Sequence, residues 1–283
     1  MKIAITSESV CDLNKEFKEK YNIQTLPFGI ILGDDEYFDG EIETSKIFEY
    51  VKASKKLPST SAVNEYQYEE FFKNILNDYD AIIHISMSDH LSCAVENARK
   101  VANRMENVNI INSKSLSFGM GLLAIYACEL RDKGLSVDEI VSKLEERKKA
   151  VQVSLILEKL DYLKKGGRCS TLQLLGANLL MLRPELIVNE GKLISSKKFR
   201  GNFKRCCEEY CDDILERFNN PDLSKVFLAF TTLTEDIKQV IREKLKAKGF
   251  KNIIEAPVGC TISCHCGENG LGVIYMNDGD KFN

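Results

Sequence analysis

Several hydroxyl-bearing side chains stand where an apolar run ends and a helical pattern begins. Thr60 and Ser61 precede one predicted helix, and Ser92 precedes another, shortly after an apolar run that ends at Ser86. The start of a helix offers free N–H groups and a positive dipole end, to which hydroxyls add further donors. Together such groups can hold an anion without a lysine or an arginine. Residue type alone, however, favours simple helix capping by serine and threonine.

A thiol and an imidazole offer a second chemistry. Cys93 lies at the start of a predicted helix, a position that can activate a thiol, and His265 is available as a base. No carboxamide or carboxylate that would orient His265 is identifiable in the sequence. A thiol-dependent acyl hydrolase or transferase that uses Cys93 and His265 is therefore our alternative interpretation rather than the first.

The ten cysteines raise the question of disulfides or a metal. Disulfide frameworks are typical of small secreted chains, and this chain has 283 residues. Cys260, Cys264 and Cys266 surround His265, and the last two would share one face of a strand. The paired Cys-x-x-Cys spacing of structural zinc is missing from the sequence. We interpret the cysteines as buried packing residues and expect no metal and no cofactor.

The sequence lacks the signatures of common catalytic and nucleotide-binding sites. It has no Walker loop, no His-Glu-x-x-His and no Gly-x-Ser-x-Gly, and its paired glycines do not fit the dinucleotide fingerprint after a strand. The net charge of −3 argues against a nucleic-acid partner. No apolar run approaches the roughly 18 residues that cross a bilayer, and the apolar part of the first residues is too short for a signal peptide. We therefore expect a cytoplasmic protein.

Strand-like runs alternate with helical patterns along the whole chain. We predict strands over residues 2–6, 25–32, 80–86, 108–111, 151–157, 185–189, 192–196, 226–230, 253–256 and 272–276. The predicted helices begin after Asp12, at Thr44, near 65 and 92, twice within 118–149, and at 203 and 235, the last ending at Gly249. This alternation indicates an α/β fold of two lobes, 1–150 and 151–283, each a largely parallel sheet flanked by helices. Ligands bind beyond the strand ends of such sheets.

Six short motifs follow one another in the order found in the DegV family, and the resemblance covers residues 3–280. Each motif is weak alone, but six in order at sensible spacing are a strong signal. They are Ile5-Thr6-Ser7-Glu8-Ser9-Val10-Cys11-Asp12-Leu13, Pro58-Ser59-Thr60-Ser61, Ser88-Asp89-His90-Leu91-Ser92, Asp161-Tyr162-Leu163-Lys164-Lys165-Gly166-Gly167-Arg168, Lys198-Phe199-Arg200-Gly201 and His265-Cys266-Gly267.

The resemblance implies a two-lobed DegV-like fold that buries a long-chain fatty acid in an enclosed apolar pocket. By motif match, Thr60 and Ser92 are the expected ligands of the acyl carboxylate. Ser61 and His265 are the expected polar neighbours. Cys93 stands beside the head group, where the family usually has glycine, so its bulk is expected to narrow that space.

The resemblance also implies a partner. Some DegV proteins are carrier subunits of bacterial fatty acid kinase and present the carboxylate to a separate ATP-using protein. Arg168 and Arg200 match positions that help to dock that kinase, whereas Glu268 departs from the family's His-x-Gly-Pro-Gly and puts the partner in question. A carrier of this kind is not itself an enzyme, and the resemblance leaves room for transient contact with a membrane. A purely structural α/β module, the third interpretation, would need a filled interior.

Overall fold

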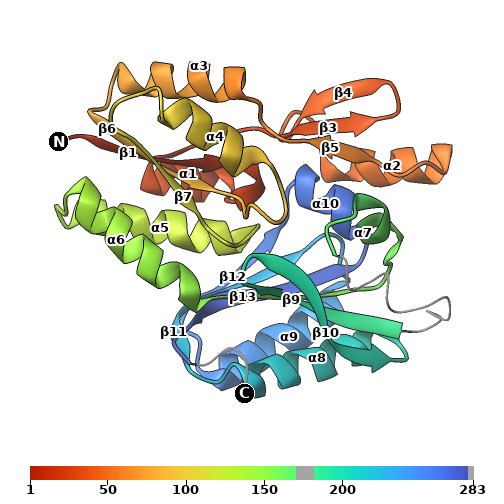
Figure 1. Ribbon diagram of the computed structural model, residues 1–283. Helices are drawn as coiled ribbons and strands as arrows, with labels where there is room; N and C mark the ends of the chain where they lie inside the picture. Colours follow the sequence, from red (N-terminus) through yellow and green to blue (C-terminus); the bar gives the residue numbers. More distant parts are fainter. Residues whose placement is uncertain (170–181, 280–283) are drawn as a thin grey trace.

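The computed structural model describes residues 1–169 and 182–279, and its N-terminal part is built on a four-stranded parallel sheet (Figure 1). The strand order is β2-β1-β6-β7, with every neighbouring pair parallel. The two central strands are buried along their whole length because helices cover both faces. The strands are β1 (Ile3–Glu8), β2 (Ile23–Leu26), β6 (Ala81–Ser86) and β7 (Val108–Asn112), and the helices are α1 (Lys15–Tyr21), α3 (Glu65–Leu76), α4 (Ala94–Ala102), α5 (Phe118–Asp132) and α6 (Val137–Arg147).

A small antiparallel sheet, ordered β4-β3-β5, projects from this lobe beside α2 (Thr44–Ser54). It contains β3 (Gly29–Leu32), β4 (Asp35–Phe38) and β5 (Ser59–Ser61). The prediction of a single strand over residues 25–32 is wrong, because the chain leaves the parallel sheet at Leu26 and enters the small sheet at Gly29. The intervening Pro27 has no N–H group with which to continue a ladder.

The larger sheet has six strands in the order β10-β9-β8-β13-β11-β12. Helices α8 (Phe203–Arg217) and α9 (Glu235–Lys248) cover one face, at the bottom of Figure 1, and the other face packs against the N-terminal lobe. Residues along β8 alternate between the two cores, so the strand is buried on both faces. The strands are β8 (Val151–Leu157), β9 (Leu182–Asn189), β10 (Lys192–Arg200), β11 (Pro221–Phe230), β12 (Ile253–Pro257) and β13 (Gly270–Asn277).

The strand directions in the larger sheet differ from the prediction. The α/β architecture is confirmed, but only β11 and β12 are parallel neighbours in this sheet, so a largely parallel second sheet is wrong. The predicted hairpin turn at Glu190-Gly191, where both residues have positive φ, makes β9 and β10 antiparallel. The last strand, β13, then inserts antiparallel between β8 and β11. Periodicity reports the type of an element but not its spatial neighbour.

One helix start and one element type were also predicted wrongly. Helix α1 begins at Lys15, and its cap is Asn14, whose side chain accepts from the amide of Phe17 at 3.0 Å. Asp12 lies before this helix in a left-handed conformation, and its carboxyl group is buried. The segment Cys260–Cys266, where two thiols sharing a strand face were considered, is the helix α10. The expected end of α9 at Gly249 is confirmed.

The chain enters the larger sheet directly after residues Lys148–Ala150, beside the expected boundary at residue 150. The C-terminal half nevertheless sends α10 into contact with α2, β3 and β5, and α7 (Asp161–Gly166) packs on it there (Figure 1). Lobes of residues 1–150 and 151–283 remain our proposal for dividing the chain, and the last four residues lie outside the described part. Among the described helices, none has the length and apolar composition needed to cross a membrane.

Candidate functional site

A cavity of about 160 Å³ lies where α10, α7 and β5 meet the start of α4 and the larger sheet. Most of its wall is apolar, with residues such as Phe28 and Leu193. Its polar and thiol-bearing side chains belong to four segments that are far apart in the sequence, and we call this space the head chamber. Those residues are Thr60, Ser92, Cys93, Arg168, Thr261, His265 and Cys266.

A second, smaller cavity of about 40 Å³ adjoins the head chamber on the side of the larger sheet. The two cavities share four lining residues, Leu116, Leu155, Ile262 and Cys266. Beyond them the second cavity, which we call the tail chamber, runs between β8, β11 and β13 and is almost entirely apolar. The interior is therefore elongated, with hydroxyl groups at one end and hydrocarbon at the other. The filled interior that a purely structural module would need is absent from this part of the described chain.

Strand β5 brings Thr60, but not Ser61, to the head chamber. Successive side chains of a strand point to opposite faces, and Thr60 lines the cavity while Ser61 is exposed. Ser61 is paired with Gly29, where an added Cβ would lie 2.1 Å from the Ser61 hydroxyl. The absence of a side chain at Gly29 therefore lets the two strands pair at this point. The structure places Ser61 outside the cavity lining.

The turn between β6 and α4 positions Ser92 and Cys93. The amides of Leu91 and Ser92 both donate to the Ser88 carbonyl, at 2.9 and 3.1 Å, and so form a tight turn. The Ser92 hydroxyl oxygen accepts from the Ala94 amide at 3.2 Å, but the N-cap position of α4 is Cys93, which makes no side-chain cap, so the helix-capping role expected from residue type is not the one Ser92 has. Ser92 lines the head chamber instead.

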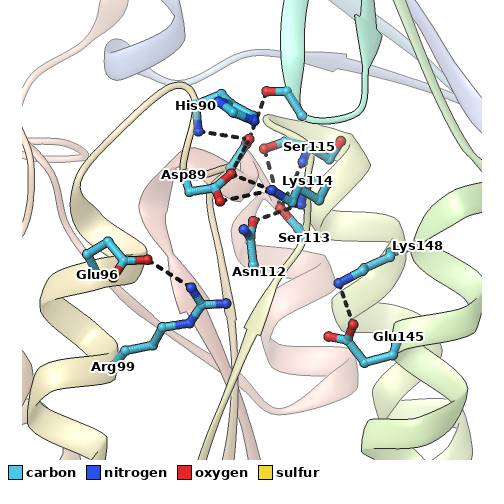
Figure 2. A network of polar contacts seen from close by, with 12 residues as sticks. Asp89, His90, Glu96, Arg99, Asn112, Ser113, Lys114, Ser115, Glu145 and Lys148 are labelled. Atoms are coloured by element: carbon cyan, nitrogen blue, oxygen red, sulfur yellow. Dashed lines mark hydrogen bonds and ion pairs between the residues drawn. The ribbon is translucent and has the colours of Figure 1, made fainter.

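The tip of the β9–β10 hairpin is bound to the same turn. The Ser88 hydroxyl donates to the Gly191 carbonyl at 2.7 Å, and an added Cβ at Gly191 would lie 2.5 Å from that hydroxyl. Figure 2 shows the ion pair beside it, in which Lys114 donates to both Asp89 oxygens at 2.8 Å. Burial raises the pKa of Asp89, but hydrogen bonds from Lys114 and Asn112 outweigh burial and lower it to about 2. The larger sheet thus helps to fix the turn that carries Ser92.

Helix α10 places His265 against Thr60. The distance between His265 Nε2 and Thr60 Oγ1 is 2.9 Å, so one hydrogen bond joins the C-terminal helix to β5. His265 Nδ1 is buried and has no hydrogen-bond partner among the described residues. Burial, and secondarily the charge of Arg168, lowers the pKa of His265 to about 4. The imidazole is therefore neutral at physiological pH, and it bonds to a hydroxyl rather than to Cys93.

The glycine-rich motif after α7 packs directly on α10. An added Cβ at Gly166 would lie 2.4 Å from His265 Nδ1, and one at Gly267 would lie 2.6 Å from the Tyr162 ring. Gly167 ends α7 in a left-handed conformation, with φ of 66°. Two motifs about one hundred residues apart therefore form one packed unit. Their glycines are the positions at which the helices approach most closely.

The two arginines expected to dock a partner have different positions. Arg168 is an exposed residue that also lines the head chamber, and it donates to the carbonyls of Leu91 and Gly166, at 3.3 and 2.5 Å. Arg200 is exposed at the end of β10 and is not part of the cavity lining. The structure therefore brings Arg168 to the same cavity as Thr60 and Ser92, and it leaves Arg200 outside.

Three site residues were missed by sequence analysis: Asp12, Asp39 and Thr261. Thr261 lines the head chamber one helical turn before His265. Asp12 accepts from the Gly259 amide at 2.8 Å, and Asp39 accepts from the next two amides and from the Thr261 hydroxyl. Asp12 was interpreted as a local helix cap, and nothing near Asp39 in the sequence indicates a residue more than 200 positions away.

The cysteines do not form a metal or disulfide centre within the described part of the chain. All ten are free, and only Cys93 is exposed. No three His, Cys, Asp or Glu side chains of residues 1–169 and 182–279 converge as a metal site would require. Burial raises the pKa of Cys264 and Cys266, the latter to about 12. Both thiols are therefore buried and protonated at neutral pH.

Comparison with known proteins gives consistent results over the whole chain. The sequence model described as uncharacterised proteins of the DegV family matches residues 2–278. A DegV domain-containing protein of Clostridium acetobutylicum is 31% identical over 278 residues, which cover 97% of this chain and 98% of the relative.

Solved structures share the fold. A DegV family protein of Thermus thermophilus, described by its fatty acid binding, has a TM-score of 0.89 at 24% identity, covering 98% of this chain and all of that protein. A Thermotoga maritima protein whose structure reveals fatty acid binding has a TM-score of 0.81 at 25% identity, with coverage of 98% and 99%. The fatty acid kinase (Fak) B3 protein of Streptococcus pneumoniae, loaded with linoleic acid, has a TM-score of 0.84 at 21% identity, with coverage of 98% and 100%.

Proposed function

The chain belongs to the DegV family, and from this membership we propose that it binds a long-chain fatty acid and presents the carboxylate to a separate kinase. The observation that carries the proposal is the elongated interior, in which an apolar tail chamber adjoins a head chamber lined by Thr60, Ser92 and His265. The carboxyl group lies among the hydroxyls and the acyl chain extends toward the tail chamber, whose volume of about 40 Å³ must widen to take it. The protein is a cytoplasmic carrier with the fatty acid as its ligand, and no cofactor takes part.

The hydrogen-bond partners of Thr60 and Ser92 leave both hydroxyls able to donate to a carboxylate. An unpaired buried N–H group costs more than an unpaired ring nitrogen lone pair, so the neutral His265 carries its proton on Nε2 and donates to Thr60. Thr60 Oγ1 then accepts from the imidazole and keeps its own proton for the ligand. Ser92 Oγ likewise accepts from the Ala94 amide and retains its proton. His265 therefore orients the donor without adding a positive charge.

The tail provides most of the binding free energy and the head group sets the orientation. Each buried methylene contributes about 0.8 kcal/mol, so roughly 14 methylenes contribute about 11 kcal/mol before the costs of association. A hydrogen bond to a charged group adds only about 1.5–3 kcal/mol. Neutral donors suit a carboxylate that must be transferred to a phosphoryl donor, because a bidentate arginine would hold it more tightly.

A kinase partner is supported by the fold shared with the Fak B3 protein and by the position of Arg168 at the head chamber. Arg168 and Arg200 are both exposed cations in a chain of net charge −3. We place both at the surface that receives an acidic or phosphate-bearing partner. Such charges act mainly on the rate of association.

The ligand assignment is tested with the double variant Thr60→Ala with Ser92→Ala. We expect lipid to remain in the purified protein, as measured by native mass spectrometry, because the tail is untouched. The carboxyl ¹³C resonance of bound, labelled oleate should shift and broaden because its donors are lost. Ser61→Ala is the matched control, since it removes the neighbouring hydroxyl that lies outside the cavity. A carboxyl resonance that the double variant leaves unchanged would refute the assignment, and a wild-type protein that carries no lipid would refute the function.

The docking assignment is tested with Arg168→Glu and Arg200→Glu together. Fatty acid binding should be unchanged in Arg200→Glu alone, because Arg200 lies outside the cavity lining, and it is measured separately in the double variant because Arg168 lines the head chamber. In the double variant, phosphorylation of the bound acid by a bacterial fatty acid kinase should fall by at least tenfold at low salt. The dependence of the rate on ionic strength should also flatten, because the steering charges are gone. A double variant that is phosphorylated as fast as the parent at low salt would show that the arginines have only a structural role.

A further inference from the structure

Helix α10 forms one wall of the proposed acyl site, yet it has only seven residues. Thr261 and His265 are one turn apart and both line the head chamber. Ile262 and Cys266 line the head and tail chambers together. A helix this short has few internal hydrogen bonds to stabilise it. Groups outside the helix must therefore determine where its cavity-lining side chains stand.

Two carboxyl groups of the N-terminal lobe satisfy the first free amides of this helix. Asp12 accepts from Gly259, at the cap position, at 2.8 Å. Asp39 accepts from the amides of Cys260 and Thr261, at 2.9 and 3.3 Å. Free amides and a positive dipole end favour carboxylates at this end of a helix. The helix is thus attached through its N-terminus to residues that belong to the opposite half of the chain.

Asp39 also determines the direction of one hydroxyl in the head chamber. The Thr261 hydroxyl donates to Asp39 at 2.6 Å, and the Ser9 hydroxyl donates to the same oxygen at 3.0 Å. A threonine hydroxyl has a single proton. Because that proton is committed to Asp39, Thr261 can only accept a hydrogen bond from a ligand. Thr60 and Ser92 differ from it in this respect, since each retains a proton to donate.

We propose that Asp39 is a positioning residue for the carboxyl group of the fatty acid: it holds α10 in place and fixes Thr261 as a hydrogen-bond acceptor that faces the ligand. The inference rests on the proposed function, and it assigns hydrogen-bond donors and an acceptor to different side chains of the head chamber. Two hydroxyls donate to the carboxyl group, and the third accepts its acid proton. The chamber therefore stabilises the protonated acid relative to a chamber with three donors.

The proton affinity of the bound acid depends on every ionisable group around it. The titratable or charged groups of the lining are His265 and Cys266 on α10, Cys93 at the start of α4 and Arg168 after α7, while Asp39 stands behind Thr261. The substitutions proposed here leave the lining groups in place. Differences between variants therefore report on Thr261 and Asp39.

The experiment measures the pH titration of oleate that carries ¹³C at its carboxyl carbon, bound to the full-length chain. Thr261→Val removes the acceptor, so we expect the midpoint to fall by roughly one pH unit. Asp39→Asn is expected to lower the midpoint further. The asparagine NH₂ group can donate to Thr261 Oγ1, and the proton of the Thr261 hydroxyl then turns toward the ligand. Thr261→Ser keeps the hydroxyl and should keep the wild-type midpoint. Asp35→Asn, the same change at an exposed position of β4, is the control.

The outcomes separate this inference from the proposed function. A wild-type chain that binds no oleate overturns both. A chain that binds oleate but shows the same midpoint in Thr261→Val and Asp39→Asn overturns the inference alone. An equal shift in Thr261→Ser and Thr261→Val would also overturn it, because that result means loosened packing rather than a lost acceptor. If Asp39→Asn does not fold, the comparison of the two Thr261 variants decides.

Discussion

Glu8 and Asp12 are two buried carboxyl groups separated by a single turn of chain, and their surroundings are opposite in character. Glu8 ends β1 and is fully buried, and Asp12 lies just after it with 7% exposure. Both accept hydrogen bonds, but among the described residues only Ser117 and Gly259 donate to Asp12. The Glu8 carboxylate accepts four, from the Tyr68 and Ser86 hydroxyls at 2.6 and 2.5 Å, the His84 ring at 3.1 Å and the Met87 amide at 3.0 Å.

The two carboxyl groups therefore respond to burial in opposite ways. Burial raises the pKa of Glu8, but the charge and hydrogen bond of His84, together with the two hydroxyls, lower it below its ordinary value. Burial also raises the pKa of Asp12, its two donors only partly offset this, and the neighbouring charge of Asp39 raises it again, to about 8. The number of donors and the sign of nearby charges, rather than burial itself, decide which carboxyl group is ionised.

Each group supports one end of the proposed binding site. Glu8 holds the amide of Met87, whose side chain lines the head chamber. Asp12 joins Ser117, which lines the tail chamber, to Gly259 at the start of α10. An ionised group and a protonated group thus stand behind the same cavity. Substitutions that replace only the charge of each group are the most direct way to test whether the two differ.

The largest effect is expected from Glu8→Gln. The amide is similar in size but presents an NH₂ group to neighbours that are themselves donors, and it leaves His84 without its carboxylate. Breaking a buried pair in this way costs about 3–5 kcal/mol. Urea unfolding at pH 7 should show a loss of about 3 kcal/mol. Glu16→Gln, at an exposed position of α1, is the control and should stay within about 0.5 kcal/mol of the parent. If Glu8→Gln lowers the free energy of unfolding by less than about 1 kcal/mol, the charge of Glu8 is not what holds its four hydrogen-bond donors together.

The pH dependence of stability is the second test. The pKa of Asp12 is raised in the folded chain, so between pH 4 and 8 the folded state holds a proton that the unfolded state has lost. This contribution to stability is complete below pH 4 and is lost as the pH rises toward 8. Its slope is at most about 1.4 kcal/mol per pH unit, or about 2.7 kcal/mol between pH 5 and 7.

The variant Asp12→Asn should remove that slope. The unfolding free energy of the parent minus that of the variant should therefore fall steadily from pH 5 to pH 7. Glu8 acts in the opposite direction, because its pKa is lowered. Its contribution is present above about pH 4.5 and is lost only as the pH falls further, so Glu8→Gln should lie parallel to the parent over the same range. Parallel curves for parent and Asp12→Asn would show that Asp12 is ionised throughout.

The comparison also shows what the sequence was able to predict. Strand β6 was predicted because it is a nearly continuous apolar run, and the hairpin at Glu190-Gly191 because this pair separates two strand-like runs. These are local properties. The order and direction of strands in the larger sheet depend on which segments meet in space, so periodicity did not indicate that β13 lies between β8 and β11.

The residues of the candidate site also divide into those with a local sequence signal and those without one. Thr60, Ser92 and His265 were singled out through their motifs, and the structure brings them to one cavity, although their role as ligands stays a prediction. Ser61 was included through the same motif match, but strand alternation turns it away from the cavity. Helix α10 and its attachment to Asp39 had no local signal, since the carboxylate and the amides that it holds are more than 200 residues apart. Contacts of this kind appear only once the chain is folded.

The smallest expected effect distinguishes the two carboxyl groups most sharply. At pH 6 the protonated Asp12 already resembles an asparagine, because one oxygen accepts from the Gly259 amide and the other side of the group faces the Ser117 hydroxyl. In Asp12→Asn, the carbonyl oxygen can keep the bond from Gly259 while the NH₂ group donates to Ser117 Oγ. Urea unfolding at pH 6 should therefore change by less than about 1 kcal/mol, against about 3 kcal/mol for Glu8→Gln. Asp12→Ala leaves the Gly259 amide without a partner and should cost about 1–3 kcal/mol. If Asp12→Asn were as damaging as Glu8→Gln, both groups would be buried anions, and α10 would be held by charge rather than by hydrogen bonds alone.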